Sequence, residues 1–193
     1  MSEERISNLP ENEQELFNQD GKKGVELTLE EQELLLELHR KAKVSSKLMS
    51  IFGLLQFLFA LLVCVGFVVP AIVISTVYGE TYPELATAAT AMTVTGIVYP
   101  LVLLVMGVLV RGRGKVESYF CSPAIKREPI CIVSHHTAKL PFLVYFILSI
   151  VFLSPFAIVA LVFDKKTRDF VADEENMAMF LAMEQRTLET QKY

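Results

Sequence analysis

Three long stretches of this 193-residue chain contain no Asp, Glu, Lys, Arg or His: residues 48–79, 85–110 and 140–163. They hold 32, 26 and 24 residues, and a helix needs about 20 apolar residues to cross the hydrocarbon core of a bilayer. All 40 formal charges lie on the other 111 residues. This segregation predicts an all-α integral membrane protein with three transmembrane helices, and it argues against a soluble domain, a disulfide scaffold or a nucleic-acid-binding protein.

The three stretches differ in length and composition. Residues 140–163 hold five Leu, five Phe, four Val and three Ile, so this stretch is predicted to form one transmembrane helix. Residues 48–79 are longer than a bilayer requires, and Pro70 is the expected place for a bend because it lacks an N–H. The short segment 79–84 predicts an antiparallel hairpin of the first two helices, with Gly79 as the C-cap of the first.

Two predicted helix starts carry the same capping pattern, a Thr followed three residues later by a Glu. Thr28 and Glu31 begin an amphipathic helix over residues 28–47, which is expected to continue into the first apolar stretch because no proline interrupts it. Thr81 and Glu84 repeat the pattern before the second stretch. The sequence therefore predicts one long helix on each side of the turn.

The first part of the second stretch, residues 85–96, is rich in Ala and Thr. Small side chains let two helix backbones approach closely, so this part is expected to pack against another helix. The residues proposed for that packing surface are Ala88, Ala89, Thr93 and Gly96. The alternative is a pore or substrate cavity with a polar lining formed by Gln56, Thr87, Thr90 and Thr93.

Basic residues near the ends of the apolar stretches predict the orientation, because Lys and Arg accumulate on the cytoplasmic side. They are Arg40, Lys41, Lys43 and Lys47 before the first stretch; Arg111, Arg113, Lys115, Lys126, Arg127 and Lys139 between the second and third; and Lys165, Lys166 and Arg168 after the third. With three spans, a cytoplasmic N-terminus places ten of these inside and three outside. The prediction is a plasma or inner membrane protein with its N-terminus in the cytoplasm and its C-terminus outside.

The terminal segments are polar. Residues 1–27 are strongly acidic and are predicted to form a mobile tail. Residues 164–193 are predicted to contain a second amphipathic helix. The apolar faces of the two amphipathic helices either cover the protein's own loop or dock a partner. The residues assigned to a partner interface are Leu34, Leu38, Met177, Phe180 and Leu181.

Residues 111–139 form a basic loop in which two short strands are expected, over 116–121 and 130–133. Its excess positive charge either sets the topology or binds anionic lipid. The loop also holds candidate metal ligands, namely Cys121, Cys131, His135 and His136. Zinc accepts two thiolates and two imidazoles, but its ligands usually come in closely spaced pairs, and adjacent histidines are expected to diverge. No metal and no cofactor are therefore predicted.

No nucleophile, phosphate-binding or metalloprotease motif is found in the sequence, and the apolar stretches hold no ionisable side chain of the kind that ion-coupled carriers use. The predicted function is non-enzymatic: an accessory, assembly or scaffolding subunit of a larger membrane complex. Its expected partners are the lipid bilayer and other membrane subunits or further copies of itself, with no nucleic acid. The alternative is an oligomeric channel or transporter component with a Thr-lined conduit.

Overall fold

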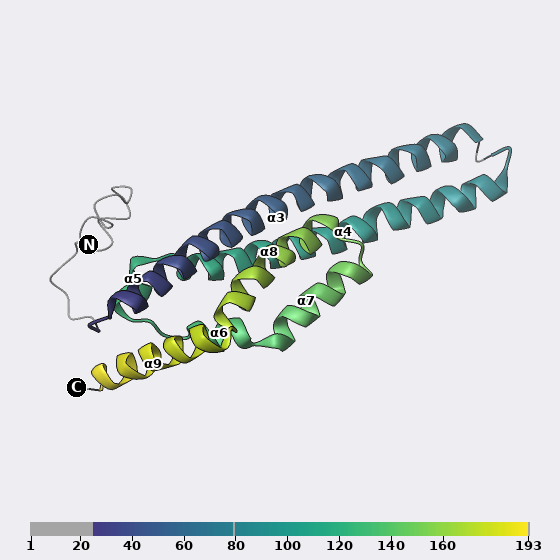
Figure 1. The fold of residues 1–193 in the computed structure, drawn as a ribbon. Helices are drawn as coiled ribbons and strands as arrows, with labels where there is room; N and C mark the ends of the chain where they lie inside the picture. Colours follow the sequence, from purple (N-terminus) through teal and green to yellow (C-terminus); the bar gives the residue numbers. More distant parts are fainter. Residues whose placement is uncertain (1–24, 79, 193) are drawn as a thin grey trace.

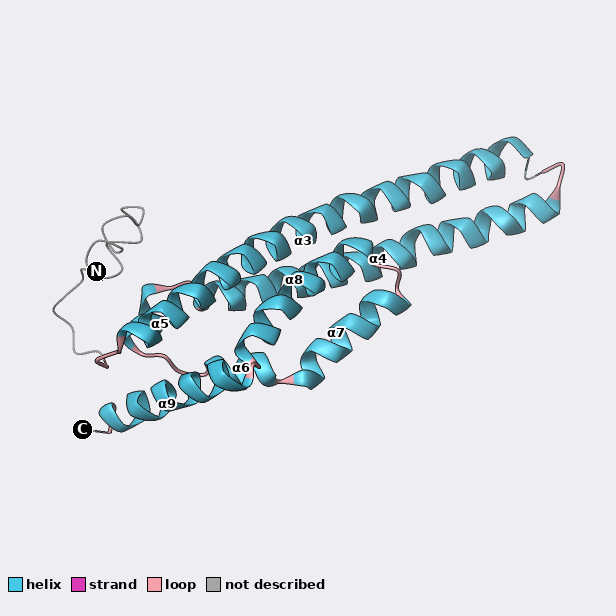
Figure 2. Cartoon of the chain, viewed as in Figure 1, coloured by secondary structure: helices cyan, strands magenta, loops and turns pink. Residues whose placement is uncertain are grey.

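The computed structural model describes residues 25–78 and 80–192, and every regular element in those ranges is a helix, which confirms the predicted all-α fold (Figures 1 and 2). The two strands predicted in the basic loop are wrong, because residues 116–121 form the end of a long helix and the turn after it, and residues 130–133 form an irregular segment and the start of a short helix. The predicted acidic tail lies almost entirely outside the described residues. The helices are α3 (Leu29–Tyr78), α4 (Pro83–Tyr119), α5 (Pro123–Arg127), α6 (Ile132–Thr137), α7 (Lys139–Val151), α8 (Pro155–Val171) and α9 (Glu174–Thr190).

Helix α3 runs unbroken for 50 residues, about 75 Å, from the amphipathic segment into the first apolar stretch, as predicted. Its start is the predicted capping box. The backbone N–H of Thr28 donates to Glu31 Oε2 at 2.9 Å, and the backbone N–H of Glu31 donates to Thr28 Oγ1 at 3.3 Å. Two of the unpaired N–H groups of a helix start are thereby satisfied.

Helices α3 and α4 form a long antiparallel hairpin, which confirms the predicted pairing (Figure 1). Glycines permit their close approach. A Cβ on Gly96 would lie 2.7 Å from the Cβ of Phe67, and a Cβ on Gly53 or on Gly107 would lie 3.1 Å from the carbonyl oxygen of the other glycine. Larger residues at these positions would push the helices apart.

The turn of the long hairpin ends differently from the prediction. Pro83 occupies the first turn of α4, as expected, but the N-cap is Tyr82 and no side chain caps the helix, so the capping box of Thr81 and Glu84 is wrong. The missing N–H of proline makes a side-chain cap less necessary at this end. The predicted C-cap, Gly79, lies outside the described residues.

The third apolar stretch is not one helix. Helix α7 ends at Val151 and α8 begins at Pro155, and Figure 1 shows α8 running back toward the end from which α7 came. Leu153, at φ 46°, turns the chain. A residue preceding proline avoids the helical region, and proline favours the first turn of a new helix, so the break falls at Ser154. The prediction of a single transmembrane helix over 140–163 is wrong; α7 and α8 form a short hairpin.

The short hairpin packs on the long one. The ring of Phe156 lies 6.4 Å from that of Phe52 and 5.9 Å from that of Phe59, both on α3. At the tip, the hydroxyl of Tyr99 on α4 lies 3.0 Å from the carbonyl oxygen of Phe152 and 3.3 Å from that of Leu153. The carbonyls exposed by the break therefore have a hydrogen-bond donor.

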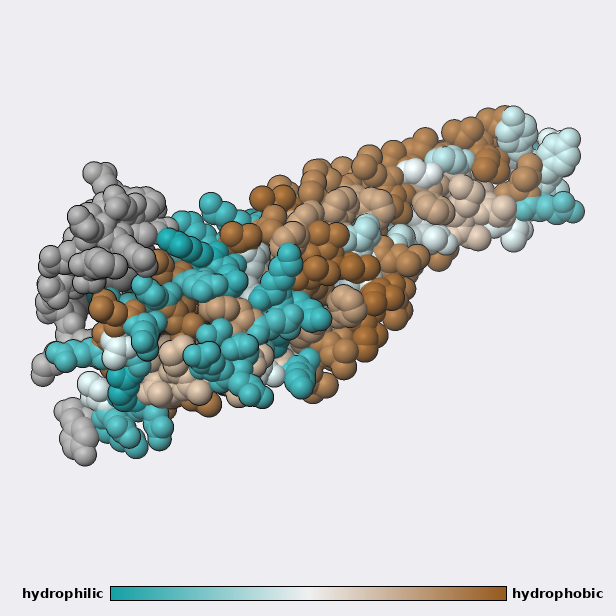
Figure 3. All heavy atoms as spheres, viewed as in Figure 1, coloured by the Kyte–Doolittle hydropathy of each residue, from teal (hydrophilic) through white to brown (hydrophobic). Residues whose placement is uncertain are grey.

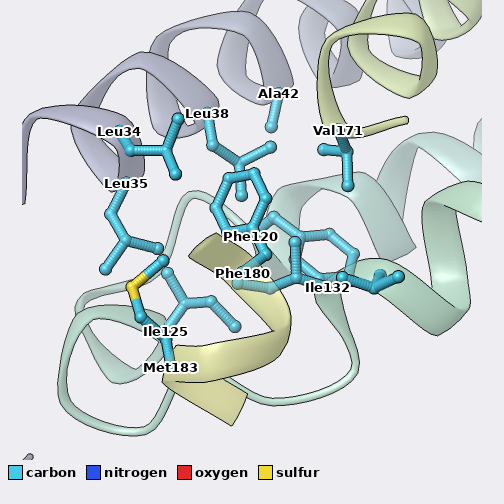
Figure 4. Close-up of a cluster of buried hydrophobic side chains, with 11 residues drawn as sticks. Leu34, Leu35, Leu38, Ala42, Phe120, Ile125, Ile132, Val171, Phe180 and Met183 are labelled. Carbon is cyan, nitrogen blue, oxygen red and sulfur yellow. The ribbon is translucent and has the colours of Figure 1, made fainter. Parts of the chain in front are cut away.

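The remaining helices form a cap at one end of the long hairpin. This cap is built around a cluster of buried apolar side chains, which we call the head core (Figure 4). Its side chains come from α3, α5, α6, α8 and α9, and from Phe120, the residue that ends α4. The members are Leu34, Leu35, Leu38, Ala42, Phe120, Ile125, Ile132, Val133, Val171, Phe180 and Met183. The head core holds the C-terminal helix against the first turns of α3.

Candidate functional site

The long hairpin presents an apolar surface over most of its length (Figure 3). Both α3 and α4 are long and apolar enough to cross a membrane. Within the most apolar window of each helix, only 11% of α3 and 33% of α4 is buried, so most of each window lies on the surface of the chain. Large side chains such as Leu61, Leu62 and Val105 are more than half exposed. Such a surface needs a cover of lipid or protein.

The predicted packing surface on α4 is divided between two faces. Ala89 and Gly96 are buried, with Gly96 against α3, and Thr93 is half-buried, whereas Ala88 is exposed. Three of the four residues therefore lie in or beside the contact between α3 and α4. Thr87, which the sequence placed in the polar lining, forms an exposed row on α4 with Ala91 and Thr95, each four residues from the next.

The predicted polar lining does not come together within one chain. Each of the three threonine hydroxyls donates to a carbonyl four residues earlier in α4: Thr87 to Pro83, Thr90 to Ala86 and Thr93 to Ala89. Gln56 is buried beside Gly107, which lies 14 residues, or about 21 Å, further along α4 than Thr93. The amide and the hydroxyls thus occupy different levels of the hairpin.

The apolar residues assigned to a partner interface mostly face the protein's own interior. Leu34, Leu38 and Phe180 belong to the head core, and Met177 packs against it (Figure 4). Leu181 is 48% exposed. The amphipathic helices therefore cover the protein's own loop, which was the other interpretation of the same pattern.

A compact polar cluster lies inside the head, where the end of α4 meets α6. The carboxylate oxygen Oε1 of Glu117 lies 3.1 Å from Nε2 of His135 and 3.5 Å from Nε2 of His136. The side chains of Glu117 and His136 are fully buried, and that of His135 is 21% exposed. The ligating atoms of the three residues lie within 4.8 Å of one another. We call these three residues the Glu–His cluster.

Local structure explains how adjacent histidines reach one carboxylate. Cys131 adopts a left-handed conformation, φ 59°, and starts the short helix α6. The ring of Phe120 stacks on His135 at 5.0 Å and meets His136 edge-on at 4.7 Å, so one aromatic side chain positions both imidazoles. The expectation that neighbouring histidines diverge is therefore wrong here: their rings are perpendicular, 4.9 Å apart, and both face Glu117.

The two cysteines of the candidate metal set lie outside this cluster. Cys131 is exposed. The Sγ of Cys121 donates to the carbonyl oxygens of His39 at 3.7 Å and of Glu117 at 3.8 Å. Burial, with the nearby charge of Glu117, raises the pKa of the Cys121 thiol to about 11, so it is a thiol rather than a thiolate at neutral pH. The structure assembles only two of the four predicted ligands.

Glu117 is the residue that sequence reasoning missed. Burial tends to raise the pKa of its carboxyl group, but hydrogen bonds and charge interactions with His135 and His136 outweigh that effect and lower the pKa to about 2. The available signal was its place as the one acidic residue in a run of basic ones, residues 111–127. A single carboxylate among basic residues indicates a position where that carboxylate has a specific partner.

A second buried polar contact lies beside the Glu–His cluster and joins α4 to α8. Arg113 Nε donates to Asp164 Oδ2 at 2.7 Å, with the two side chains 8% and 0% exposed. Arg168 lies 4.0 Å from the same oxygen and donates to the carbonyl oxygen of Ala138. Burial raises the pKa of the Asp164 carboxyl, opposed by the charge of Arg113. This arrangement anchors the short hairpin to the end of α4.

A cavity of about 310 Å³ opens next to the Glu–His cluster. It is lined mainly by apolar side chains of α4, together with His135, Arg113 and Tyr145. His135, the partly exposed member of the cluster, is thus reachable from outside the head.

In comparisons with known proteins, the chain matches no family model, no curated protein and no solved structure.

Proposed function

We propose that this protein is an integral membrane protein with two transmembrane helices and a short hairpin that enters the bilayer and returns to the same face. The thirteen basic residues that flank the apolar stretches then all lie on one side, and the turn between α3 and α4 has none. The contact between Arg113 and Asp164 supports this, because it holds the basic ends of α4 and α8 at one level. By the positive-inside tendency, that side and both chain ends are cytoplasmic.

The depth of the short hairpin fits this arrangement. Tyr99, which contacts its tip, precedes Arg111 by 12 residues, about 18 Å of helix. This depth is near the middle of a hydrocarbon core about 30 Å thick. Irregular backbone at such a depth needs internal hydrogen-bond partners, and the Tyr99 hydroxyl supplies one. A three-span topology places the three basic residues after Phe163 outside the cell, against the positive-inside tendency. In the arrangement proposed here they lie on the same side as the other ten.

The protein acts as an accessory or assembly subunit that binds other membrane helices through the outer half of α4. The observation that carries this proposal is the exposed row of Thr87, Ala91 and Thr95, small residues spaced four apart on a helix of membrane-spanning length. Such spacing lets a second helix approach closely within a bilayer, where packing rather than hydrophobicity drives association.

Replacing Ala91 with phenylalanine is expected to abolish this assembly, because the ring would hold a neighbouring helix away. The control is Ile97→Phe, which alters a residue that is 51% exposed on a different face of the same helix and leaves the row intact. The measurement is native mass determination of the full chain extracted with its surrounding lipid. The proposal predicts a complex larger than one chain that is lost in Ala91→Phe and kept in Ile97→Phe.

The composition of the complex distinguishes the two predicted functions. A complex that contains other proteins besides this chain supports the accessory role. A symmetric assembly of this chain alone that conducts ions in liposomes would instead favour the Thr-lined conduit, with Thr87, Thr90 and Thr93 contributed by several copies. A single chain in native lipid would contradict both.

A further inference from the structure

The Glu–His cluster has the composition of a metal site, and the structure points to a use for it. We propose that Glu117, His135 and His136 bind one divalent transition-metal ion, for which zinc is the best fit, at the junction between the membrane helices and the head. Two imidazoles and one carboxylate form the protein ligand set of zinc sites that keep a fourth coordination position open. This proposal is independent of the assembly role of α4.

The spacing of the three donors fits such an ion. In a tetrahedral site with metal–ligand bonds of 2.0–2.1 Å, donor atoms lie about 3.3 Å apart. Glu117 Oε1 lies 3.1 Å and 3.5 Å from the two Nε2 atoms, and all three ligating atoms lie within 4.8 Å. Binding one ion would require the most widely spaced pair of donors to close from as much as 4.8 Å to about 3.3 Å, and His135, as the partly exposed member, is the residue that would move.

His136 is oriented as metal-ligating histidines usually are. Its Nδ1 lies 2.8 Å from the carbonyl oxygen of Ile132, which can only accept a hydrogen bond, so Nδ1 carries the proton. In the neutral ring, Nε2 then directs a lone pair toward Glu117. An outer hydrogen bond of this kind fixes the tautomer and increases the basicity of the ligating nitrogen.

Two buried polar atoms in the cluster also favour a cation. In the described structure, Oε2 of Glu117 has no hydrogen-bond partner, and Nε2 of His136 has only Oε1 of Glu117, at the long distance of 3.5 Å. With no cation between them, Nε2 of His136 and the carboxylate of Glu117 would be two acceptors facing each other at 3.5 Å in a buried space, which is repulsive. A cation between them, either a proton or a metal ion, converts this repulsion into attraction.

The surroundings allow both access and charge balance. The cavity of about 310 Å³ borders His135 and gives an ion, and a small ligand on its fourth position, a path from outside. Arg113 and Arg168 lie nearby, but both contact Asp164, which offsets part of their charge. The ring of Phe120 contacts both imidazole rings and limits their movement on that side of the donor set.

The test uses the full chain in detergent, freed of tags and stripped with a chelator, with zinc ions alone as the probe. One zinc ion per chain is expected to bind. Glu117→Gln and His136→Ala are each expected to weaken zinc binding more than about tenfold. Cys131→Ser and Cys121→Ser are the matched controls, because they remove the other candidate ligands, and they are expected to retain full binding.

X-ray absorption of the zinc-loaded wild-type protein needs no variant and therefore stands even if Glu117→Gln fails to fold. Nitrogen and oxygen neighbours at about 2.0–2.1 Å are expected, without sulfur at about 2.3 Å. Sulfur ligands, or binding that survives both Glu117→Gln and His136→Ala, would overturn the donor set. No stoichiometric zinc at all would show that a proton, not a metal, balances the carboxylate, and stoichiometric iron in the purified protein would overturn the choice of zinc.

Discussion

Replacing Asp164 with alanine is expected to destabilise the folded protein by about 3–5 kcal/mol, the cost of removing one partner from a buried ion pair. Asp164 is fully buried and accepts a hydrogen bond from Arg113 at 2.7 Å, with Arg168 at 4.0 Å. Without this carboxylate, two buried guanidinium groups at the end of the short hairpin lose their counter-charge. Thermal or chemical unfolding of the purified protein in detergent measures the difference.

Two further variants separate the ion pair from a general effect of substitution. Asp169→Ala changes an exposed aspartate on the same helix and is expected to alter stability by no more than about 0.5 kcal/mol. Burial raises the pKa of Asp164, which shows that its charge pays a desolvation cost. Replacing both members of the closer pair with apolar residues, Arg113→Met with Asp164→Leu, is therefore expected to recover the part of the loss that comes from Arg113, while Arg168 still lacks its counter-charge. Equal stability of Asp164→Ala and Asp169→Ala would contradict the buried pair.

The second large effect is expected at Phe180, where substitution by alanine should cost about 3–5 kcal/mol. This side chain is fully buried in the head core and contacts the ring of Phe170 edge-on at 6.4 Å. Removing it leaves a cavity between α9 and α3 that the surrounding helices can fill only in part. Loss of α9 from the head would appear as faster proteolysis within residues 174–190.

The control for Phe180 is its neighbour Leu181, which is 48% exposed and which the sequence assigned to the same partner interface. Leu181→Ala is expected to change stability by no more than about 0.5 kcal/mol. If both variants were harmless, α9 would not be packed on the head. If Leu181→Ala were the more damaging, the face of α9 directed toward the head would be the opposite one.

The parts of the fold that follow from local patterns could be predicted from the sequence. The charge-free stretches 48–79 and 85–110 predicted the apolar parts of α3 and α4, because an uninterrupted apolar run of more than about 20 residues is typical of a long helix. The capping box of Thr28 and Glu31 was predictable because both partners lie within one turn.

The third stretch shows where composition alone misleads. Its 24 residues satisfy the length rule, yet Ser154 and Pro155 divide it, because Pro155 occupies the first turn of a new helix. The chain turns back because Tyr99 and α3 offer the break a hydrogen-bond donor and a packing surface. Those contacts join residues that are 53 and 104 positions apart in the sequence, which no local pattern reveals.

The candidate site was half predictable for the same reason. His135 and His136 stood out by residue type, but their partner Glu117 precedes them by 18 residues on another helix. Cys121 and Cys131 were candidate ligands with the histidines on residue type alone. In the structure Cys131 is exposed outside the cluster, and burial raises the pKa of the Cys121 thiol. The stacking of Phe120 on the imidazoles decides which donors meet.

The side of the membrane on which each chain end lies tests the proposed architecture most directly. Epitope tags before Met1, between Glu80 and Thr81, and after Tyr193 can be probed by protease in sealed vesicles of known orientation. A hairpin of two spans with a returning α7 and α8 predicts that the two terminal tags share one face and that the tag in the turn lies on the other. A C-terminal tag on the face opposite the N-terminal one would contradict the short hairpin and restore three spans.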